Sequence, residues 1–191
     1  MQYAIDIVLF PPAHIMAYAF ALNARAYAQG NAAVQLGRTD FIPHLSLLMG
    51  VMDEHDTKEI YTRMARIATD FPSIPVTISS VHDSWMEADN TGILRALHSR
   101  ILQDIDPLLS HQAKNDDFIH DVGEKITPDC YPWVNEFSTK FSEENYRPHI
   151  TIGNPGEHPE FSLPLSFEAS DIAVCQLGRY NTCRKVLWST Q

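Results

Sequence analysis

Two short segments of the chain repeat one pattern of residue types that can perform acid/base chemistry. They read Pro43-His44-Leu45-Ser46-Leu47 and Pro148-His149-Ile150-Thr151-Ile152. Side chains alternate between the two faces of a β-strand. The histidine and the hydroxyl residue of each segment are therefore predicted to share one face, while the aliphatic residues point into a core. Two such strands side by side bring two imidazoles and two hydroxyls to one cleft.

Those four groups match the requirements of phosphodiester cleavage. A neutral imidazole takes a proton from the attacking water or hydroxyl, and a protonated imidazole gives a proton to the leaving oxygen. The reference pKa of histidine, about 6.5, lets both forms coexist near neutral pH. Hydroxyls donate hydrogen bonds to the non-bridging oxygens, where negative charge is held in the transition state. We therefore predict that His44 and His149 are catalytic, that Ser46 and Thr151 bind substrate, and that neither a metal nor another cofactor is needed.

The complete five-residue pattern is more specific than a histidine followed two positions later by a hydroxyl residue. The segments His55-Asp56-Thr57 and His82-Asp83-Ser84 contain the shorter pattern, but they lack the preceding proline and the alternating aliphatic residues. Of the nine histidines, His44 and His149 alone carry the full pattern. This repetition in two distant segments favours a functional pair over two unrelated strand histidines.

Length and charge limit the classes to which this protein can belong. The chain has 191 residues, 21.6 kDa and 45% apolar residues, which suits one domain with a substantial core. Its 14 Lys and Arg against 24 Asp and Glu give a net charge of -10, which argues against long duplex nucleic acid as a partner. The mean hydropathy is -0.19 and no long apolar run occurs, so no membrane span is expected. The first strand-like segment contains Asp6 and no basic residue, which is not typical of a secretory signal.

The cysteines predict a reducing compartment. Cys130, Cys175 and Cys183 form no Cys-x-x-Cys pair. We expect three reduced thiols, partly in the core, with no disulfide framework and no cysteine-rich zinc site. A cytoplasmic location is therefore favoured. The oligomeric state stays open, with a monomer favoured.

The hydrophobic spacing predicts an α+β protein. Helical spacing and helix-boundary residues indicate helices over 11–30, 53–71, 92–106 and 132–141. Period-two alternation indicates strands over 3–10, 42–49, 74–81, 148–153, 163–167, 172–177 and 186–189. Strands joined by short turns near the end of the chain favour antiparallel sheets over a doubly wound parallel sheet. The apolar stripes of the helices, including Trp133, Phe137 and Phe141, are interpreted as core.

The paired segments resemble the signature of the 2H phosphoesterase superfamily, also called the LigT-like or 2′-5′ RNA ligase-like family. The first segment continues as Leu48-Met49-Gly50 and the second follows Tyr146-Arg147, and both contexts resemble the surroundings of the family's motifs. The resemblance implies that residues 1–191 form a single bilobal α+β domain. In such a domain two antiparallel sheets with pseudo-twofold symmetry flank a central cleft, and helices pack outside.

The same resemblance implies a function and a set of site residues. It implies metal-independent action on 2′,3′-cyclic or 2′-5′ phosphodiester bonds of nucleotides or RNA ends. By position, His44 and His149 resemble the acid/base pair, and Ser46 and Thr151 resemble the phosphate-binding hydroxyls. Serine in the first motif, in place of the commoner threonine, keeps the hydroxyl donor. The identity of the substrate, the direction of the reaction and the choice of acid and base stay open.

Other residues and other functions stay open beside this hypothesis. Arg147 precedes the second segment and is a weaker candidate for contact with a phosphate or base, and Tyr146, Tyr180 and Trp85 are candidates for stacking on a nucleobase. A binding module would hold a nucleotide or RNA end without turnover. A metallohydrolase would use the two motif histidines as ligands.

Overall fold

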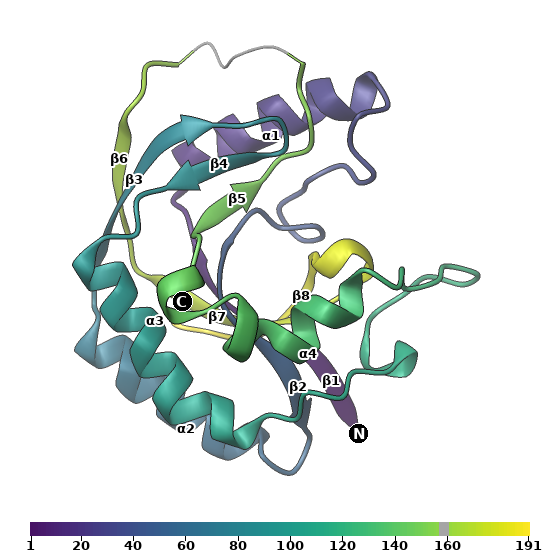
Figure 1. Cartoon of the computed structure of the whole chain (residues 1–191), viewed down its shortest axis with the longest axis vertical. Coiled ribbons are helices and arrows are strands. Elements are labelled where there is room, and N and C mark those ends of the chain that lie inside the picture. The colour runs from purple at the N-terminus through teal and green to yellow at the C-terminus, as the bar shows by residue number, and fades with distance from the viewer. Residues whose placement is uncertain (157–160) are drawn as a thin grey trace.

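Eight strands form two separate antiparallel sheets in the computed structural model, which describes residues 1–156 and 161–191 (Figure 1). The first sheet has the order β2 (Leu45–Asp53), β1 (Gln2–Phe10), β7 (Asp171–Leu177) and β8 (Cys183–Ser189). The second sheet has the order β5 (His149–Thr151), β4 (Trp85–Ala88), β3 (Ile74–Val81) and β6 (Leu165–Ala169). Each pair of neighbouring strands is antiparallel. The predicted α+β class with two antiparallel sheets is confirmed.

Four α-helices connect the strands in the described part of the chain. They are α1 (Ala13–Ala28), α2 (Thr57–Asp70), α3 (Gly92–Ile105) and α4 (Cys130–Lys140). Figure 1 shows α2 and α3 next to each other at the lower left, and α3 contacts both β2 and β3. At the start of α3, the Thr91 hydroxyl accepts a hydrogen bond from the Leu94 N–H, which satisfies one of the free donors of the first turn. No helix within these described residues has the length and apolar character to cross a membrane.

Both motif segments lie at the edge of a sheet. β2 is an edge strand of the first sheet, β5 is an edge strand of the second, and the two edge strands contact each other. Each of them pairs with one inner strand, β1 or β4. The two sheets therefore repeat one arrangement with pseudo-twofold symmetry, and the motif strands lie where the sheets meet.

Alternation along the strands separates the core from the cleft. The aliphatic residues of the motifs are fully buried, as predicted, namely Leu45, Leu47, Ile150 and Ile152. On β1, Ile7 belongs to the main core, whereas Val8 belongs to a smaller apolar cluster on the opposite face. Asp6 shares the face of Val8, because side chains two residues apart in a strand point the same way. The carboxylate of Asp6 is thus directed away from the main core.

Several element boundaries, and one strand, differ from the sequence-based expectation. β2 begins at Leu45 rather than at residue 42, because the N–H of Ile42 donates to the carbonyl of Cys183 instead of joining the ladder with β1. Helix α2 begins at Thr57 and not directly after Asp53, which ends β2. The strand β4 was not predicted, because its four residues, Trp-Met-Glu-Ala, include no β-branched side chain.

The expectation of three reduced thiols was wrong for two of the cysteines. Cys175 of β7 and Cys183 of β8 form a disulfide, with 5.6 Å between their Cα atoms. Their Cα separation lies in the range that a disulfide requires, because the β7–β8 hairpin folds one strand back on the other. The spacing in the sequence contains no sign of this hairpin geometry. Cys130 is a free, buried thiol.

Candidate active site

A cavity of about 470 Å³ lies between the two motif strands, and the predicted catalytic and substrate-binding residues line it. Both histidines line it, together with both hydroxyl residues and the weaker candidate; these are His44, His149, Ser46, Thr151 and Arg147. The structure therefore brings two distant segments to one space. Their catalytic and binding roles stay predictions.

The two imidazoles are held in the same way. The Nδ1 atom of His44 lies 2.6 Å from the carbonyl oxygen of Ile42, and the Nδ1 atom of His149 lies 2.7 Å from the carbonyl oxygen of Arg147. In both cases the acceptor is the carbonyl two residues earlier, so Nδ1 carries the proton and donates it. This contact leaves Nε2 as the nitrogen that exchanges a proton during acid/base chemistry. The shared geometry repeats the pseudo-twofold relation of the sheets at the level of single atoms.

A carboxylate that the sequence analysis did not assign to the site lies behind the first motif. Asp6 of β1 is fully buried, and its Oδ2 atom lies 3.4 Å from Nε2 of His44. The same Oδ2 atom accepts a hydrogen bond of 2.6 Å from the Ser46 hydroxyl. Burial raises the pKa of the Asp6 carboxyl, and the contacts with His44 and Ser46 oppose that effect. The signal in the sequence was a single acidic residue within an apolar strand, since buried carboxylates are rare unless they are paired.

A β-bulge in β2 places Ser46 beside this carboxylate. Ile7 pairs with Leu48 while Val8 pairs with Ser46, so Leu47 is an extra residue in the ladder. Bulges change the direction of neighbouring side chains and occur often beside active sites. Ser46 here faces Val8 and reaches Asp6, which lies two residues away on the same face of β1.

The surroundings shift the two histidines in opposite directions. Burial lowers the pKa of His44, but the hydrogen bond and charge of Asp6, with the Ile42 carbonyl, outweigh it, so the pKa is raised above 6.5. Burial lowers the pKa of His149 below 6.5, and the charge of His44 adds to this effect against the opposing Arg147 carbonyl. His44 therefore holds a proton more readily than His149 does.

Tyr146 connects the two motifs. Its hydroxyl donates a hydrogen bond of 3.0 Å to the carbonyl oxygen of Ser46, and its ring packs against His98 of α3. Tyr146 is buried, and burial raises the pKa of its hydroxyl, which therefore stays protonated and remains a donor. Tyr146 thus lines the cavity mainly as a structural residue and not as the exposed stacking surface that the sequence suggested.

The wall on the side of the second motif depends on one asparagine and one glycine. The amide nitrogen of Asn23 in α1 donates to the carbonyl of Ile152, and its oxygen accepts from the N–H of Leu36. Gly153 has a φ of 71°, and a Cβ atom added there would lie 2.6 Å from Cβ of Ala32. Any other residue at this position would be strained in its backbone and would push Ala32 away.

Aromatic side chains that were interpreted as core form part of the cavity. Trp133 and Phe141 stack with 4.0 Å between ring centroids, and both line the cavity together with Phe137 and Tyr180. Trp133 is 39% exposed, so this stack presents an open ring face. Trp85 lies outside the lining, yet its ring centroid is 6.1 Å from that of His149.

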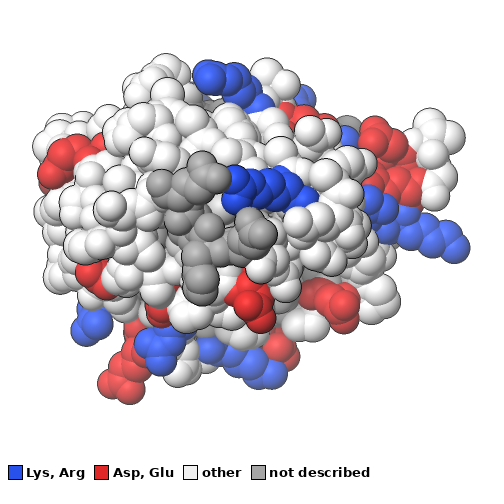
Figure 2. Space-filling model, turned by 90° about the horizontal axis from the view of Figure 1, so that it is seen from above, with Lys and Arg blue, Asp and Glu red and all other residues white. Residues whose placement is uncertain are grey.

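Charge around the cavity is sparse. Arg147 is the one Lys or Arg among the described residues that line it, and it is exposed. Figure 2 shows basic and acidic groups scattered over the face that it presents, next to each other at its edges and with uncharged surface over much of the rest. This distribution suits a ligand with a single phosphate group better than a long polyanion.

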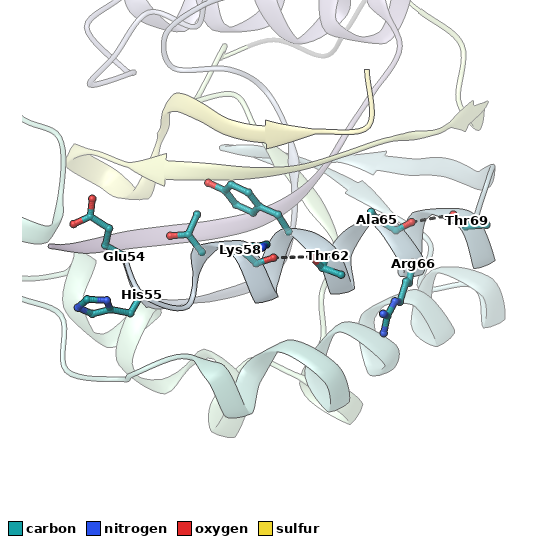
Figure 3. A pocket seen from close by; sticks show the side chains of 9 residues that line it. Glu54, His55, Lys58, Thr62, Ala65, Arg66 and Thr69 are labelled. Atoms are coloured by element: carbon teal, nitrogen blue, oxygen red, sulfur yellow. Dashed lines mark hydrogen bonds between the residues drawn. The ribbon is translucent and has the colours of Figure 1, made fainter.

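A second groove follows helix α2 and contains neither motif (Figure 3). It is wide and open, with a volume of about 820 Å³, and polar residues such as Glu54, Lys58 and Arg66 line it. The Thr62 and Thr69 hydroxyls donate to helix carbonyls four residues earlier, as the dashed lines in Figure 3 mark. These hydroxyls are thus engaged by their own helix rather than directed at a common point.

Within the described ranges, no three or more His, Cys, Asp or Glu side chains are grouped so that they could hold a metal ion. The two motif histidines, with Asp6 beside His44, are therefore not part of such a group in that part of the chain. A catalytic zinc site usually has three protein ligands.

The chain is similar to known proteins in its sequence family and in its fold. Residues 35–169 match the family model of the 2′-5′ RNA ligase superfamily. No curated protein matches the chain in sequence.

Solved structures of low sequence identity share the fold. TT0787 of Thermus thermophilus has a TM-score of 0.55 at 12% identity, over 97% of this chain and 96% of that chain. E. coli LigT in apo form has a TM-score of 0.53 at 12% identity, over 98% and 96% of the two chains. E. coli LigT complexed with 3′-AMP has a TM-score of 0.50 at 11% identity, over 99% and 97%. Since the family match covers most of its length, the chain belongs to the 2′-5′ RNA ligase superfamily, as its paired motifs predicted.

Proposed function

We propose that this protein is a phosphoesterase that cleaves 2′,3′-cyclic or 2′-5′ phosphodiester bonds of nucleotides or RNA ends without a metal. One histidine of the pair His44 and His149 takes a proton from the attacking water, and the other gives a proton to the leaving ribose oxygen. Ser46 and Thr151 are the candidate hydroxyls for the non-bridging phosphate oxygens. Family membership alone does not select among these bonds.

One observation carries the proposal. Two imidazoles, one directly before β2 of the first sheet and one on β5 of the second, line one cavity. Each presents Nε2 as its reactive nitrogen because a backbone carbonyl engages Nδ1. A pair with opposite pKa shifts suits acid/base catalysis, because one member has to be neutral while the other is charged. Histidines that served only as packing residues would not need both a common cavity and this common orientation.

The reaction conserves every proton that the pair exchanges. The water oxygen forms a bond to phosphorus as its proton passes to the neutral imidazole. The bond between phosphorus and the ribose oxygen breaks, and that oxygen takes the proton of the protonated imidazole. Exchange with solvent then restores the starting protonation of both histidines.

The cavity suits a small nucleotide as substrate. Arg147 offers one cationic contact, and the stacked rings of Trp133 and Phe141 offer an apolar platform of the kind on which nucleobases stack. A structural relative, E. coli LigT, has been solved with 3′-AMP, which combines one base with one phosphate. We expect the protein to act as a monomer. The expected cytoplasmic location rested on reduced thiols, and the Cys175–Cys183 disulfide removes that ground, because disulfides are uncommon in the cytoplasm.

The decisive experiment is an assay of the purified protein on a panel of phosphodiesters. The panel contains the four nucleoside 2′,3′-cyclic monophosphates, 2′-5′ dinucleotides and RNA ending in a cyclic phosphate, each with and without a chelator. The proposal expects turnover of at least one of these compounds, with the same rate in the chelator. Binding without turnover of any compound would favour a nucleotide-binding module, and loss of turnover in the chelator would favour a metallohydrolase.

A further inference from the structure

We propose that Asp6 is a positioning residue that keeps a proton on His44, so that His44 is the general acid of the pair and His149 the general base. This inference rests on the proposed function and adds to it the division of roles between the two histidines. It is carried by the contacts of the Asp6 carboxylate, by its burial and by the difference from the second motif, where the described residues provide no matching carboxylate contact.

The charge of a buried carboxylate needs a positive partner. Asp6 is fully buried, and His44 is the one ion-pair partner of Asp6 among the described residues. An ionised carboxylate out of water is costly unless a positive charge lies beside it. The Oδ1 atom of Asp6 has no hydrogen-bond partner in the described part of the chain, so the compensation acts through Oδ2. A proton on His44 supplies this compensation at the distance that the structure shows, and the nearby His44 charge opposes the effect of burial on the Asp6 carboxyl.

The surroundings of the two ring nitrogens of His44 indicate its protonation state. Nδ1 faces the carbonyl of Ile42 at 2.6 Å and Nε2 faces Oδ2 of Asp6 at 3.4 Å, so both nitrogens face acceptors. Only the imidazolium form has a proton for each of them. The short hydrogen bond from the Ser46 hydroxyl to the same Oδ2 atom agrees with an ionised carboxylate as acceptor.

The contact between the Asp6 carboxylate and the His44 ring is long. At 3.4 Å it exceeds the usual range of an N–H···O hydrogen bond, about 2.7–3.2 Å. Asp6 therefore acts on His44 largely through its charge and does not hold the Nε2 proton in a strong bond. The proton remains available to a leaving oxygen in the cavity.

The two motif histidines differ in the carboxylates beside them. His149 repeats the Nδ1 contact of His44, but no carboxylate forms an ion pair with it within 1–156 and 161–191. Glu87 lies opposite His149 in the strand pairing, but its carboxylate is bonded to His82 and Ser80. His149 therefore lacks the compensation that His44 has, and it is the histidine suited to accept a proton.

The groups that face the Asp6–His44 pair are few. β5 contributes His149, and the segment before it contributes the Tyr146 hydroxyl, which stays neutral. β2 contributes the Ser46 hydroxyl. On β7, Cys175 pairs with Asp6 in the strand register, and its disulfide carries no charge. The titration of His44 thus reports mainly on Asp6, with a smaller contribution from His149.

The test compares the titration of individual histidines by NMR in the wild-type protein and in Asp6→Asn, which keeps the shape of the side chain and removes its charge. The variants His44→Ala and His149→Ala identify the two resonances by their loss. We expect His44 to titrate at higher pH than His149 in the wild type and to move to lower pH in Asp6→Asn. Asp171→Asn is the matched control, since Asp171 is a half-buried carboxyl of the same sheet that bonds Thr190. It should leave the titration of His44 in place.

The kinetic counterpart is the pH profile of kcat. In Asp6→Asn the fall of kcat at alkaline pH should begin at lower pH, because His44 loses its proton more easily without the Asp6 charge. The KM should stay close to the wild-type value. The loss of kcat should be smaller than the roughly 10²–10⁴-fold expected when an acid/base group is removed. A purely structural role of Asp6 would lower the yield of folded protein without moving this limb.

Two outcomes overturn the inference. An unchanged titration of His44 in folded Asp6→Asn overturns it. If Asp6→Asn does not fold, the wild-type titration alone decides, and a His44 that titrates below His149 overturns it. The NMR measurement needs no substrate, so a wild-type protein that cleaves no member of the panel would refute the proposed function separately.

Discussion

The imidazole of His98 lies parallel to the ring of Tyr146, with 3.9 Å between the ring centroids and 6° between the planes. His98 belongs to α3, and its Nδ1 donates to the carbonyl of Leu47 in the first motif strand. Its Nε2 accepts from the N–H of Glu143, just before the second motif. A neutral histidine with one donor and one acceptor thus joins the helix layer to both halves of the cavity.

The hydroxyl of Tyr146 makes this connection testable. We expect Tyr146→Phe to lower the free energy of unfolding by about 1 kcal/mol, because it removes one buried hydrogen bond to the Ser46 carbonyl and keeps the ring stacked on His98. Urea denaturation measures the change. Tyr27→Phe is the control, since Tyr27 is exposed on α1. Equal stability of the two variants would contradict the role of this hydrogen bond.

Removal of either motif histidine should abolish turnover and leave the fold intact. His44→Ala and His149→Ala should each reduce kcat by about 10²–10⁴-fold, the usual contribution of one positioned acid/base group. The matched control is His55→Ala, which alters a histidine followed two residues later by threonine, outside the cavity. Circular dichroism checks the fold of all three. Wild-type activity in the double variant His44→Ala with His149→Ala would refute the mechanism.

The two hydroxyl residues should differ in their effect. Thr151 is exposed at the cavity, so Thr151→Ala should reduce kcat by about 10²–10³-fold, as for one lost donor to a developing anion. Ser46 already donates its one proton to Asp6, so Ser46→Ala should cost less. Thr151→Ser, which keeps the hydroxyl, should retain most of the activity. Equal losses in the two alanine variants would show that Ser46 turns toward the substrate during the reaction.

The rate should depend on pH with a maximum near neutrality. The reaction needs His149 neutral, and its pKa is lowered below 6.5, so the rate should rise on the acid side below that value. It also needs His44 protonated, and its pKa is raised above 6.5, so the rate should fall only at higher pH. The oppositely directed shifts widen the plateau between the two limbs. A kcat/KM profile that is flat between pH 5 and 9 would contradict paired-histidine catalysis.

Much of the fold and the location of the motifs followed from the sequence, because both are encoded in local patterns. Proline before an alternating segment, with aliphatic residues at every second position, placed Leu45 and Ile150 in the core and His44 and His149 on the opposite face. Pro12 before α1 predicted the start of that helix in the same way. Each of these inferences needs only the period of one strand or helix.

The parts of the site that escaped prediction depend on contacts between distant segments. Asp6 is one carboxyl in an apolar strand until the pairing of β1 with β2 sets it beside Ser46. Trp133 and Phe141 have the spacing of core residues, and only the placement of α4 beside β2 exposes their rings to the cavity. The disulfide likewise depends on a hairpin whose bulges shift the register between β7 and β8.

The position of both motifs on outermost strands has a consequence for how such proteins diverge. An outermost strand is anchored by a ladder on one flank only, and among the described residues no backbone ladder joins β2 to β5. The gap between the two imidazoles therefore depends on side-chain contacts such as those of Tyr146 with the Ser46 carbonyl and of Asn23 with the Ile152 carbonyl. Solved structures share this fold at about one identical residue in eight, as the 12% identity with TT0787 illustrates.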